Sequence, residues 1–287
     1  VLPEDCVLAT NTSALPITLL AQATTRPGRF IGLHFFSPAD KMPLVEIICG
    51  EQTGDEALAA AFDLAQQLGK TPIVVNDGPG FFTTRVIGKT VSQGAQMVME
   101  GIDPVLIEAA ARANGSPVGP LAAIDEISQE TAYRNGLQMK LDAEARGETW
   151  QEQPAGELVR RMVEEFGRKG RRSGGGYYEY PEGGKKRIWP GLKQHFAPNG
   201  FKQVPFEDIK DRLVFSQCIE AVRAMQEGVI TSVADGNIGS IMGIGFPPWT
   251  GGAAQFITGY PGGKACFVAR AKELAAKYGD RFNPPAS

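Results

Sequence analysis

The sequence is poor in the residues and segments that mark several protein classes. Its 4 cysteines lie far apart, with no C-x-x-C pair and no cluster with histidine, which disfavours structural zinc and predicts reduced thiols in a reducing compartment. No apolar stretch approaches the roughly 18 residues needed to cross a bilayer, and no basic segment precedes an apolar one at the start, as it would in a signal peptide. We therefore expect a soluble protein without a metal site.

A glycine-rich dinucleotide-binding motif is also absent. Nowhere does G-x-G-x-x-G stand between a strand and a helix. Gly174-Gly175-Gly176 cannot replace it, because residues 177–180 read as a strand and offer no helix N-terminus to a phosphate. The chain opens at Val1, and residues 7–12 already read as a buried strand with its loop. We expect a truncated start, with half of any nucleotide site outside this sequence.

Charge and size set the remaining bounds. A net charge of −3 provides no general field for nucleic acid or an anionic membrane, so nucleic-acid binding is disfavoured. With 287 residues and 43% apolar composition, the chain can bury a large core and is expected to form two or three domains.

Residues 1–77 show the alternation of short apolar strands and helices that is typical of an α/β domain. A helix is predicted over residues 55–68, because Leu58, Phe62, Ala65 and Leu68 fall on one face. The predicted strands are Val7 to Ala9, Phe30 to Phe36, Leu44 to Cys49 and Ile73 to Val75.

From residue 78 the apolar residues recur about every 3.6 positions, as they do on one face of an α-helix. Ile87, Val91, Ala95 and Val98 form one stripe of a helix that should end near Gly101. The sequence after Met99 is echoed after Glu227, which suggests two related helical units. We predict a first helical domain at 78–181, a linker rich in Gly, Pro and Lys at 182–204, and a second helical domain at 205–287.

Ser13, His34 and Glu46 form the most informative constellation. Glu46 interrupts a strand-like apolar run and needs a cationic or hydrogen-bonding partner if buried, and His34 is the obvious candidate. A carboxylate stabilises a protonated imidazole while burial opposes protonation, so such a pair can take a hydroxyl proton near neutral pH. Each residue also has a structural alternative: a core histidine for His34, a structural ion pair for Glu46, and a turn or helix-cap hydroxyl for Ser13.

The order and spacing of these residues resemble the L-3-hydroxyacyl-CoA dehydrogenase family. The resemblance covers essentially the whole chain and is greatest to the dehydrogenase part of the fatty-acid β-oxidation multienzyme (trifunctional) α-subunit. It is carried by Asn11-Thr12-Ser13 and by residues 29–38, 41–48, 77–82, 167–178, 235–239 and 245–248. It implies an α/β partial Rossmann domain, its C-terminal half, followed by two mainly α-helical, mutually related domains.

By this resemblance the chain would oxidise a 3-hydroxyacyl-CoA with NAD, a step of fatty-acid β-oxidation. His34 would be the general base, Glu46 would orient and support it, and Ser13 would bind the substrate hydroxyl beside the nicotinamide. Further contacts would come from Asn11, Ser13, Ser37 and Arg172 to the cofactor and from Ser13 and Thr84 to the substrate. On composition alone Arg172 belongs to a solvated loop.

Two positions depart from the commonest family pattern, and other functions stay open. Thr84 stands where many members have the asparagine of Gly-Phe-x-x-Asn-Arg, and the trifunctional α-subunits share this threonine form. Ser37 stands where bacterial α-subunits often have an asparagine.

The resemblance also implies partners. Expected partners are an acyl-CoA substrate, an upstream enoyl-CoA hydratase domain, a thiolase subunit and a second copy in a homo-oligomer. The expected location is the bacterial cytoplasm or, in a eukaryote, the mitochondrial matrix.

Because the glycine-rich motif is missing, we expect this chain alone to bind little NAD and to be inactive or weakly active. A catalytically silent binding and assembly module of a β-oxidation complex is therefore the alternative. A third interpretation is a Rossmann-type dehydrogenase that acts on small hydroxy acids without CoA.

Overall fold

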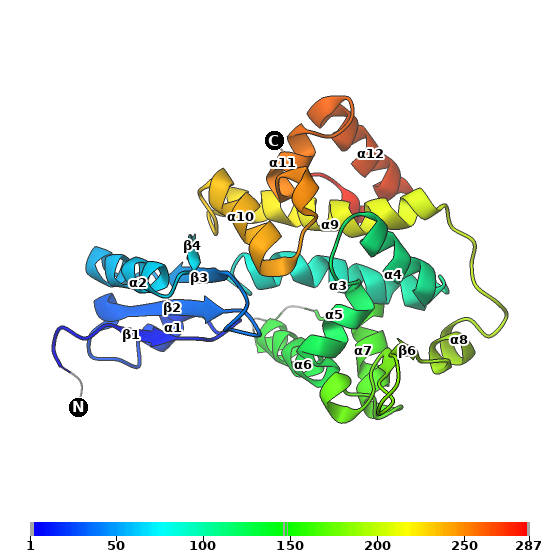
Figure 1. Ribbon diagram of the computed structural model, residues 1–287, viewed down its shortest axis with the longest axis horizontal. Coiled ribbons are helices and arrows are strands. Elements are labelled where there is room, and N and C mark those ends of the chain that lie inside the picture. The colour runs from blue at the N-terminus through cyan, green and yellow to red at the C-terminus, as the bar shows by residue number, and fades with distance from the viewer. Residues whose placement is uncertain (1–2, 146, 148, 286–287) are drawn as a thin grey trace. The chain divides into compact units, whose positions relative to one another are not determined.

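The computed structural model describes residues 3–145, 147 and 149–285, and the chain groups into two compact units (Figure 1). Unit 1 contains the described parts of 1–88 and 217–287, and unit 2 is 89–216. This grouping differs from the predicted succession of domains, because residues from 217 onward join the N-terminal segment.

Unit 1 is built on a four-stranded sheet with the order β1-β2-β3-β4. The strands are β1 (Leu8–Thr10), β2 (Phe30–Phe35), β3 (Leu44–Cys49) and β4 (Thr71–Asn76). The pairs β1·β2 and β3·β4 are parallel, whereas β2·β3 is antiparallel. All four predicted strands are present, with ends that differ by one or two residues.

Helices cover both faces of this sheet, which explains why β2 and β3 are buried along almost their whole length. Helix α2 (Asp55–Gln67) lies along one face of the sheet (Figure 1). Its Ala61 and Ala65 pack against Ile31, Val45 and neighbouring side chains. Successive side chains of a strand point to opposite faces of the sheet. The residues between those that face α2, such as His34 and Glu46, therefore point to the opposite face. There α1 (Ile17–Ala21) and α10 (Val233–Ile244) contact the strands.

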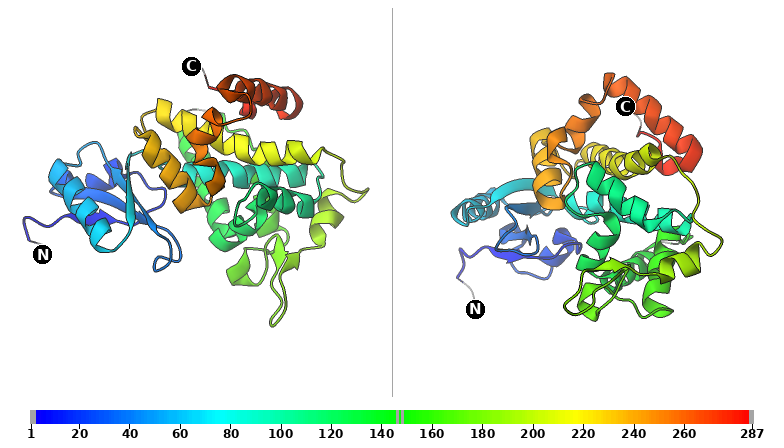
Figure 2. Two further views of the ribbon diagram at one scale, coloured as in Figure 1. Left: turned by 45° about the horizontal axis from the view of Figure 1, so that its top comes forward. Right: turned by 45° about the vertical axis from the view of Figure 1, so that its right-hand side comes forward.

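The close approach of α10 depends on glycine. A Cβ at Gly239 would lie 2.6 Å from Ile73 Cδ1, and one at Gly243 would lie 2.7 Å from Leu44 Cδ2. The same segment completes the edge of β4, since Asp235 Oδ2 accepts a hydrogen bond from Val74 N at 3.2 Å. After α10, α11 (Ala253–Thr258) and α12 (Gly263–Tyr278) follow in contact with one another (orange to red in Figure 2).

Unit 2 is mainly helical. Its core joins side chains of several helices, of which Met97, Ile107, Leu158 and Met162 are completely buried. The described helices that lie in it are α4 (Pro104–Ala113), α5 (Pro120–Ile127), α6 (Gln129–Ala145), α7 (Pro154–Glu164) and α8 (Gly191–Phe196). Two more belong partly to each unit: α3 (Thr83–Met99) begins in unit 1 and ends in unit 2, and α9 (Phe206–Gln226) begins in unit 2 and ends in unit 1. The helix predicted to end near Gly101 is α3.

The predicted linker at 182–204 is structured, which corrects the sequence-based expectation. It contains strand β6 (Arg187–Ile188), which pairs with β5 (Tyr178–Glu179) in a hairpin, and helix α8 (yellow-green in Figure 2). Leu192 is 1% exposed within the core of unit 2, and Arg168 lies over the Trp189 ring with 4.5 Å between Cζ and the centroid. Elements this short are too brief to show a hydrophobic periodicity in the sequence. Their apolar side chains are buried by contacts with residues that are distant in the chain.

Ion pairs support the predicted repeat of the helical segments. In unit 1, Arg85 Nη2 donates to Glu227 Oε1 at 2.9 Å. In unit 2, Arg212 binds both carboxylate oxygens of Glu100 at 2.7 Å. Arg85 precedes Glu100 by the same number of residues as Arg212 precedes Glu227, so each repeat supplies the cation of one pair and the anion of the other. Arg85 and Arg212 are 127 residues apart in the sequence, and the same separation relates Gln93 to Glu220 and Gly101 to Gly228.

A buried carboxyl group in unit 2 makes stability depend on pH. Glu108 is 2% exposed and accepts hydrogen bonds from Leu121 N at 2.8 Å and from the Tyr178 hydroxyl at 2.6 Å. Burial outweighs these bonds and raises the pKa of Glu108 above the ordinary carboxyl value. The pKa of Asp125, also buried, is raised for the same reason.

We expect the Glu108→Gln variant to show a flatter dependence of unfolding free energy on pH. A pKa raised in the folded state means that the folded state holds the proton more tightly. The resulting stabilisation is complete below the pKa of the unfolded chain and is lost as pH rises through the folded pKa. Urea unfolding, followed by tryptophan fluorescence in the unmodified chain and the variant over a pH series starting at about 4, measures the slope. A slope in Glu108→Gln equal to that of the unmodified chain would show that Glu108 contributes nothing to the pH dependence of stability. Any slope that the variant retains is expected from Asp125, whose pKa is also raised.

Candidate active site

The antiparallel pairing of β2 and β3 brings His34 and Glu46 together. The two residues stand directly opposite each other in the register, on the sheet face that α10 covers, and cross-strand neighbours on one face are in side-chain contact. His34 Nδ1 lies 2.9 Å from Glu46 Oε2. The predicted contact is therefore present, and it is buried: His34 is 6% exposed and Glu46 0%.

Glu46 also binds the N-terminus of α3, a contact that the sequence analysis missed. The backbone amides of Phe82 and Thr83 each donate to Glu46 Oε1 at 3.0 Å. The Thr83 hydroxyl donates to Oε2 at 2.6 Å. Both carboxylate oxygens are thus satisfied, and the negative charge lies where the helix dipole and the free amides of the first turn stabilise it. This accounts for an ionised carboxylate in the interior.

The turn before α3 aims these amides at the carboxylate. Gly80 has φ +72° and Phe81 has φ +50°. The second value is uncommon for a residue with a Cβ and carries a conformational cost. Phe81 is completely buried, so packing of its ring offsets that cost. In the sequence, the Gly78-Pro79-Gly80 turn is the one signal that the backbone bends sharply before the helix.

The surroundings of His34 leave one ring nitrogen for chemistry. The Phe36 ring lies 4.6 Å from the imidazole and the Phe81 ring 6.3 Å, measured between centroids. An anionic Glu46 accepts a hydrogen from Nδ1, which fixes the tautomer with a lone pair on Nε2. Within the described part of the chain, Nε2 has no hydrogen-bond partner. It can therefore act as a proton acceptor.

The other predicted residues follow the strand ends near this pair. β1 and β2 are parallel, so the loops after them, with Asn11, Ser13 and Ser37, leave from the same edge of the sheet, where α/β proteins bind ligands. Ser13 and Ser37 are exposed. Asn11 Oδ1 accepts a hydrogen bond from Phe35 N at 2.9 Å, so this oxygen ties the loop to β2.

Two predicted residues lie elsewhere. Thr84 is half-buried in the first turn of α3, next to Thr83. Arg172 is exposed in the turn 171–173 of unit 2. The contact of Arg172 with a cofactor stays a prediction.

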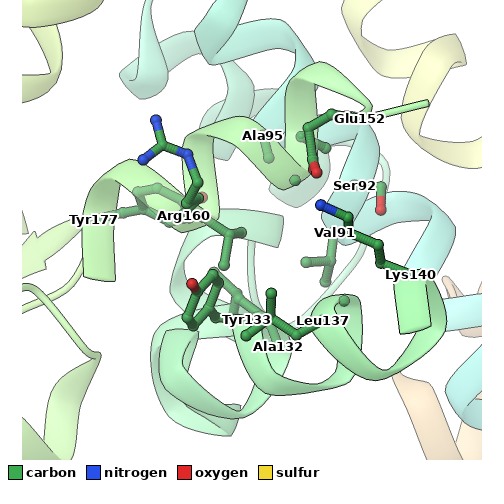
Figure 3. A pocket seen from close by; sticks show the side chains of 15 residues that line it. Val91, Ser92, Ala95, Ala132, Tyr133, Leu137, Lys140, Glu152, Arg160 and Tyr177 are labelled. Atoms are coloured by element: carbon green, nitrogen blue, oxygen red, sulfur yellow. The ribbon is translucent and has the colours of Figure 1, made fainter. Parts of the chain in front are cut away.

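Unit 2 contains a separate cavity of about 250 Å³ between α3, α6 and α7 (Figure 3). Small residues on the helices create the space, among them Ala132, Gly136 and Ala155, while Lys140 and Arg160 lie at its wall. None of the predicted site residues lines it. The described residues contain no group of three or more side chains that could hold a metal ion, and no described helix is long and apolar enough for a membrane span.

Two models of one protein family match the chain. The model of the 3-hydroxyacyl-CoA dehydrogenase NAD-binding domain matches residues 1–78, and that of the C-terminal domain of the same family matches residues 80–180. The boundary between these matches agrees with the predicted change of pattern at residue 78.

Solved structures give the same indication. The 3-hydroxybutyryl-CoA dehydrogenase of Escherichia coli is 24% identical, with a TM-score of 0.76 over 98% of this chain and 74% of that one. The (S)-3-hydroxybutyryl-CoA dehydrogenase of Ralstonia eutropha is 35% identical, with a TM-score of 0.56 over 63% of this chain and 62% of its own.

The dehydrogenase part of multifunctional enzyme 1 from C. elegans is 20% identical, with a TM-score of 0.60 over 98% of this chain and 63% of its own. At this identity, as for the E. coli protein, the likeness shows the fold alone. The chain spans less than two thirds of the length of the R. eutropha and C. elegans proteins.

Proposed function

Because the chain belongs to the 3-hydroxyacyl-CoA dehydrogenase family, we propose that it carries the proton-transfer site for NAD-dependent oxidation of an L-3-hydroxyacyl-CoA to the 3-ketoacyl-CoA. The observation that carries the proposal is the buried His34 and Glu46 pair, with 2.9 Å between Nδ1 and Oε2. A structural pair would not need an imidazole whose second nitrogen is left without a partner at the ligand-binding edge of the sheet.

The reaction removes two hydrogens from the substrate alcohol. His34 Nε2 takes the hydroxyl proton as the C3–H bond breaks and the carbonyl forms. The chemistry that bound NAD would supply is acceptance of the hydride released from C3. Glu46 keeps the Nδ1 hydrogen in place and stabilises the positive charge that develops on the ring. Protonation of Glu46 is not required, since its oxygens already accept four hydrogen bonds.

The remaining predicted residues fit the nicotinamide end of the cofactor. Ser13 and Ser37 present hydroxyl groups at the edge of the sheet, where they can bind the substrate oxygen and the cofactor, and the amide nitrogen of Asn11 can add a donor. We assign Thr84 to the substrate and Arg172 to the cofactor by the family resemblance. The sequence contains no glycine-rich turn for the pyrophosphate, so the donor set fits one half of NAD.

The biological setting is proposed from the same resemblance. A β-oxidation role would use an enoyl-CoA hydratase to supply the 3-hydroxyacyl-CoA and a thiolase to consume the 3-ketoacyl-CoA. We propose the bacterial cytoplasm or the mitochondrial matrix as the location, with association into a homo-oligomer. The short-chain specificity named for two of the similar proteins does not transfer to this chain.

The proposal is tested by the loss of NADH with acetoacetyl-CoA. Because the chain alone is expected to be slow, a chimera joins it to the N-terminal part of the R. eutropha enzyme that precedes the matching region. Both proteins are assayed with acetoacetyl-CoA and with free acetoacetate. Turnover that requires the CoA ester supports the proposal, and turnover of free acetoacetate supports the third interpretation. A folded chimera that binds NADH but reduces neither compound would instead favour the assembly module.

A further inference from the structure

Glu46 presents two oxygens that have different partners. Oε1 receives the two backbone amides that open α3, each at 3.0 Å. Valine or serine at position 83 would keep both backbone donors. Oε2 receives His34 Nδ1 at 2.9 Å and the Thr83 hydroxyl at 2.6 Å. Among the residues that the structure describes, Thr83 is the one side chain that shares with His34 the oxygen that orients the imidazole.

The burial of Thr83 gives this hydroxyl a fixed direction. Thr83 is completely buried, and its Cγ2 lies 3.3 Å from the Cβ position of Gly243 on α10. The methyl group is thus packed against α10 while the hydroxyl faces Glu46. The terminal torsion of a glutamate is otherwise broad, so the hydroxyl restricts the rotation of the carboxylate that would carry Oε2 away from Nδ1.

From this geometry we propose that Thr83 is a positioning residue for the dehydrogenase site: its hydroxyl holds Glu46 Oε2 against His34 and thereby fixes the imidazole with hydrogen on Nδ1 and a free Nε2. The inference rests on the proposed function for its catalytic consequence, whereas its structural part concerns His34 and Glu46 alone. It assigns the role to Thr83 rather than to Thr84, the neighbour that the family pattern singles out for substrate.

The test compares two replacements of Thr83, each of which keeps one of the two groups on Cβ and removes the other. Thr83→Val keeps the methyl group against Gly243 and removes the hydroxyl, whereas Thr83→Ser keeps the hydroxyl and removes the methyl group. Thr90→Val places the same substitution farther along α3 and is the control. The chain has 2 histidines, so ¹⁵N-histidine NMR resolves His34, with His195 in unit 2 as an internal reference.

We expect the Nδ1–H pattern of ¹⁵N shifts for His34 in the unmodified chain, in Thr83→Ser and in Thr90→Val. In Thr83→Val the His34 shifts should move toward an average of the two neutral tautomers, with His195 unchanged. In the chimera, Thr83→Val should lower kcat about tenfold, the effect of one hydrogen bond to a charged group, with little change in KM. Thr83→Ser should restore kcat to within about twofold.

Unchanged His34 shifts in a folded Thr83→Val variant would overturn the proposal. So would a Thr83→Ser variant that shows the averaged tautomer, because the hydroxyl would then be insufficient. If Thr83→Val does not fold, Thr83→Ala, which also lacks the hydroxyl, takes its place, and unchanged His34 shifts in that variant would overturn the proposal. The NMR measurement needs neither substrate nor NAD, so a chain without dehydrogenase activity would refute the proposed function and still give a result for Thr83.

Discussion

Replacing His34 by glutamine is expected to lower kcat for acetoacetyl-CoA reduction by about 10²- to 10⁴-fold in the chimera, the range that general acid–base catalysis contributes. Glutamine retains hydrogen-bonding groups next to Glu46 but cannot exchange a proton at neutral pH. In the direction of ketone reduction, the carbonyl oxygen would lose the acid that protonates it as hydride arrives at C3. KM should change little, because His34 acts on the reacting atoms.

The chain offers a matched control for this prediction. His195→Gln changes the other histidine, which stacks on Phe166 in unit 2 with 4.5 Å between ring centroids and has no part in the proposed reaction. Its kcat should stay within about twofold of the unmodified protein, as expected for a substitution outside the site. Equal activity of the two variants would exclude His34 as the proton carrier, whereas a loss in both would point to a general effect of histidine replacement.

Replacing Glu46 by glutamine should affect both folding and turnover. The amide has one acceptor oxygen for four donors, and its NH₂ group would face N–H or O–H groups that also donate. We expect the free energy of unfolding to fall by about 3 kcal/mol, in the range for breaking a buried charged pair. We also expect the kcat of the folded fraction to fall by about 10²-fold or more, since the imidazole loses its orientation and its counter-charge.

Urea unfolding followed by far-UV circular dichroism gives the change in stability, and Glu51→Gln provides the control. Glu51 is exposed in the same unit, so the same chemical change there should shift the unfolding free energy by less than about 0.5 kcal/mol. Similar stabilities for the two variants would contradict the role assigned to the buried carboxylate. An active, stable Glu46→Gln variant would also remove the basis for the inference about Thr83.

Much of unit 1 could be predicted because its signals are local. The strands at 30–35 and 44–49 are continuous apolar runs, and such runs bounded by turn residues indicate buried strands. The single charge in the second run, Glu46, marks itself as a site because burial of a lone carboxylate is costly. Since His34 stands near the end of the preceding strand and a loop separates the two, the pair follows from sequence once an antiparallel return is assumed.

The contacts of Glu46 with α3 could not be predicted in this way. They join residues that are 36 and 37 positions apart, and two of the three involve backbone amides, which leave no trace in residue identity. Sequence reasoning therefore named Thr84, which fits a family pattern, and passed over Thr83, whose role depends on where the helix begins.

The sequence by itself determined the strands, the helix that carries Ile87 to Val98, the resemblance to a dehydrogenase family and the His34 and Glu46 pair. Each of these depends on local periodicity or on the chemistry of a few side chains. Only the tertiary structure decided that α10 covers one face of the sheet, that Leu192 packs into the core of unit 2 and that the Thr83 hydroxyl donates to Glu46 Oε2. These features arise from close packing between distant segments, where a glycine that admits a helix or an amide that meets a carboxylate has no pattern of its own along the chain.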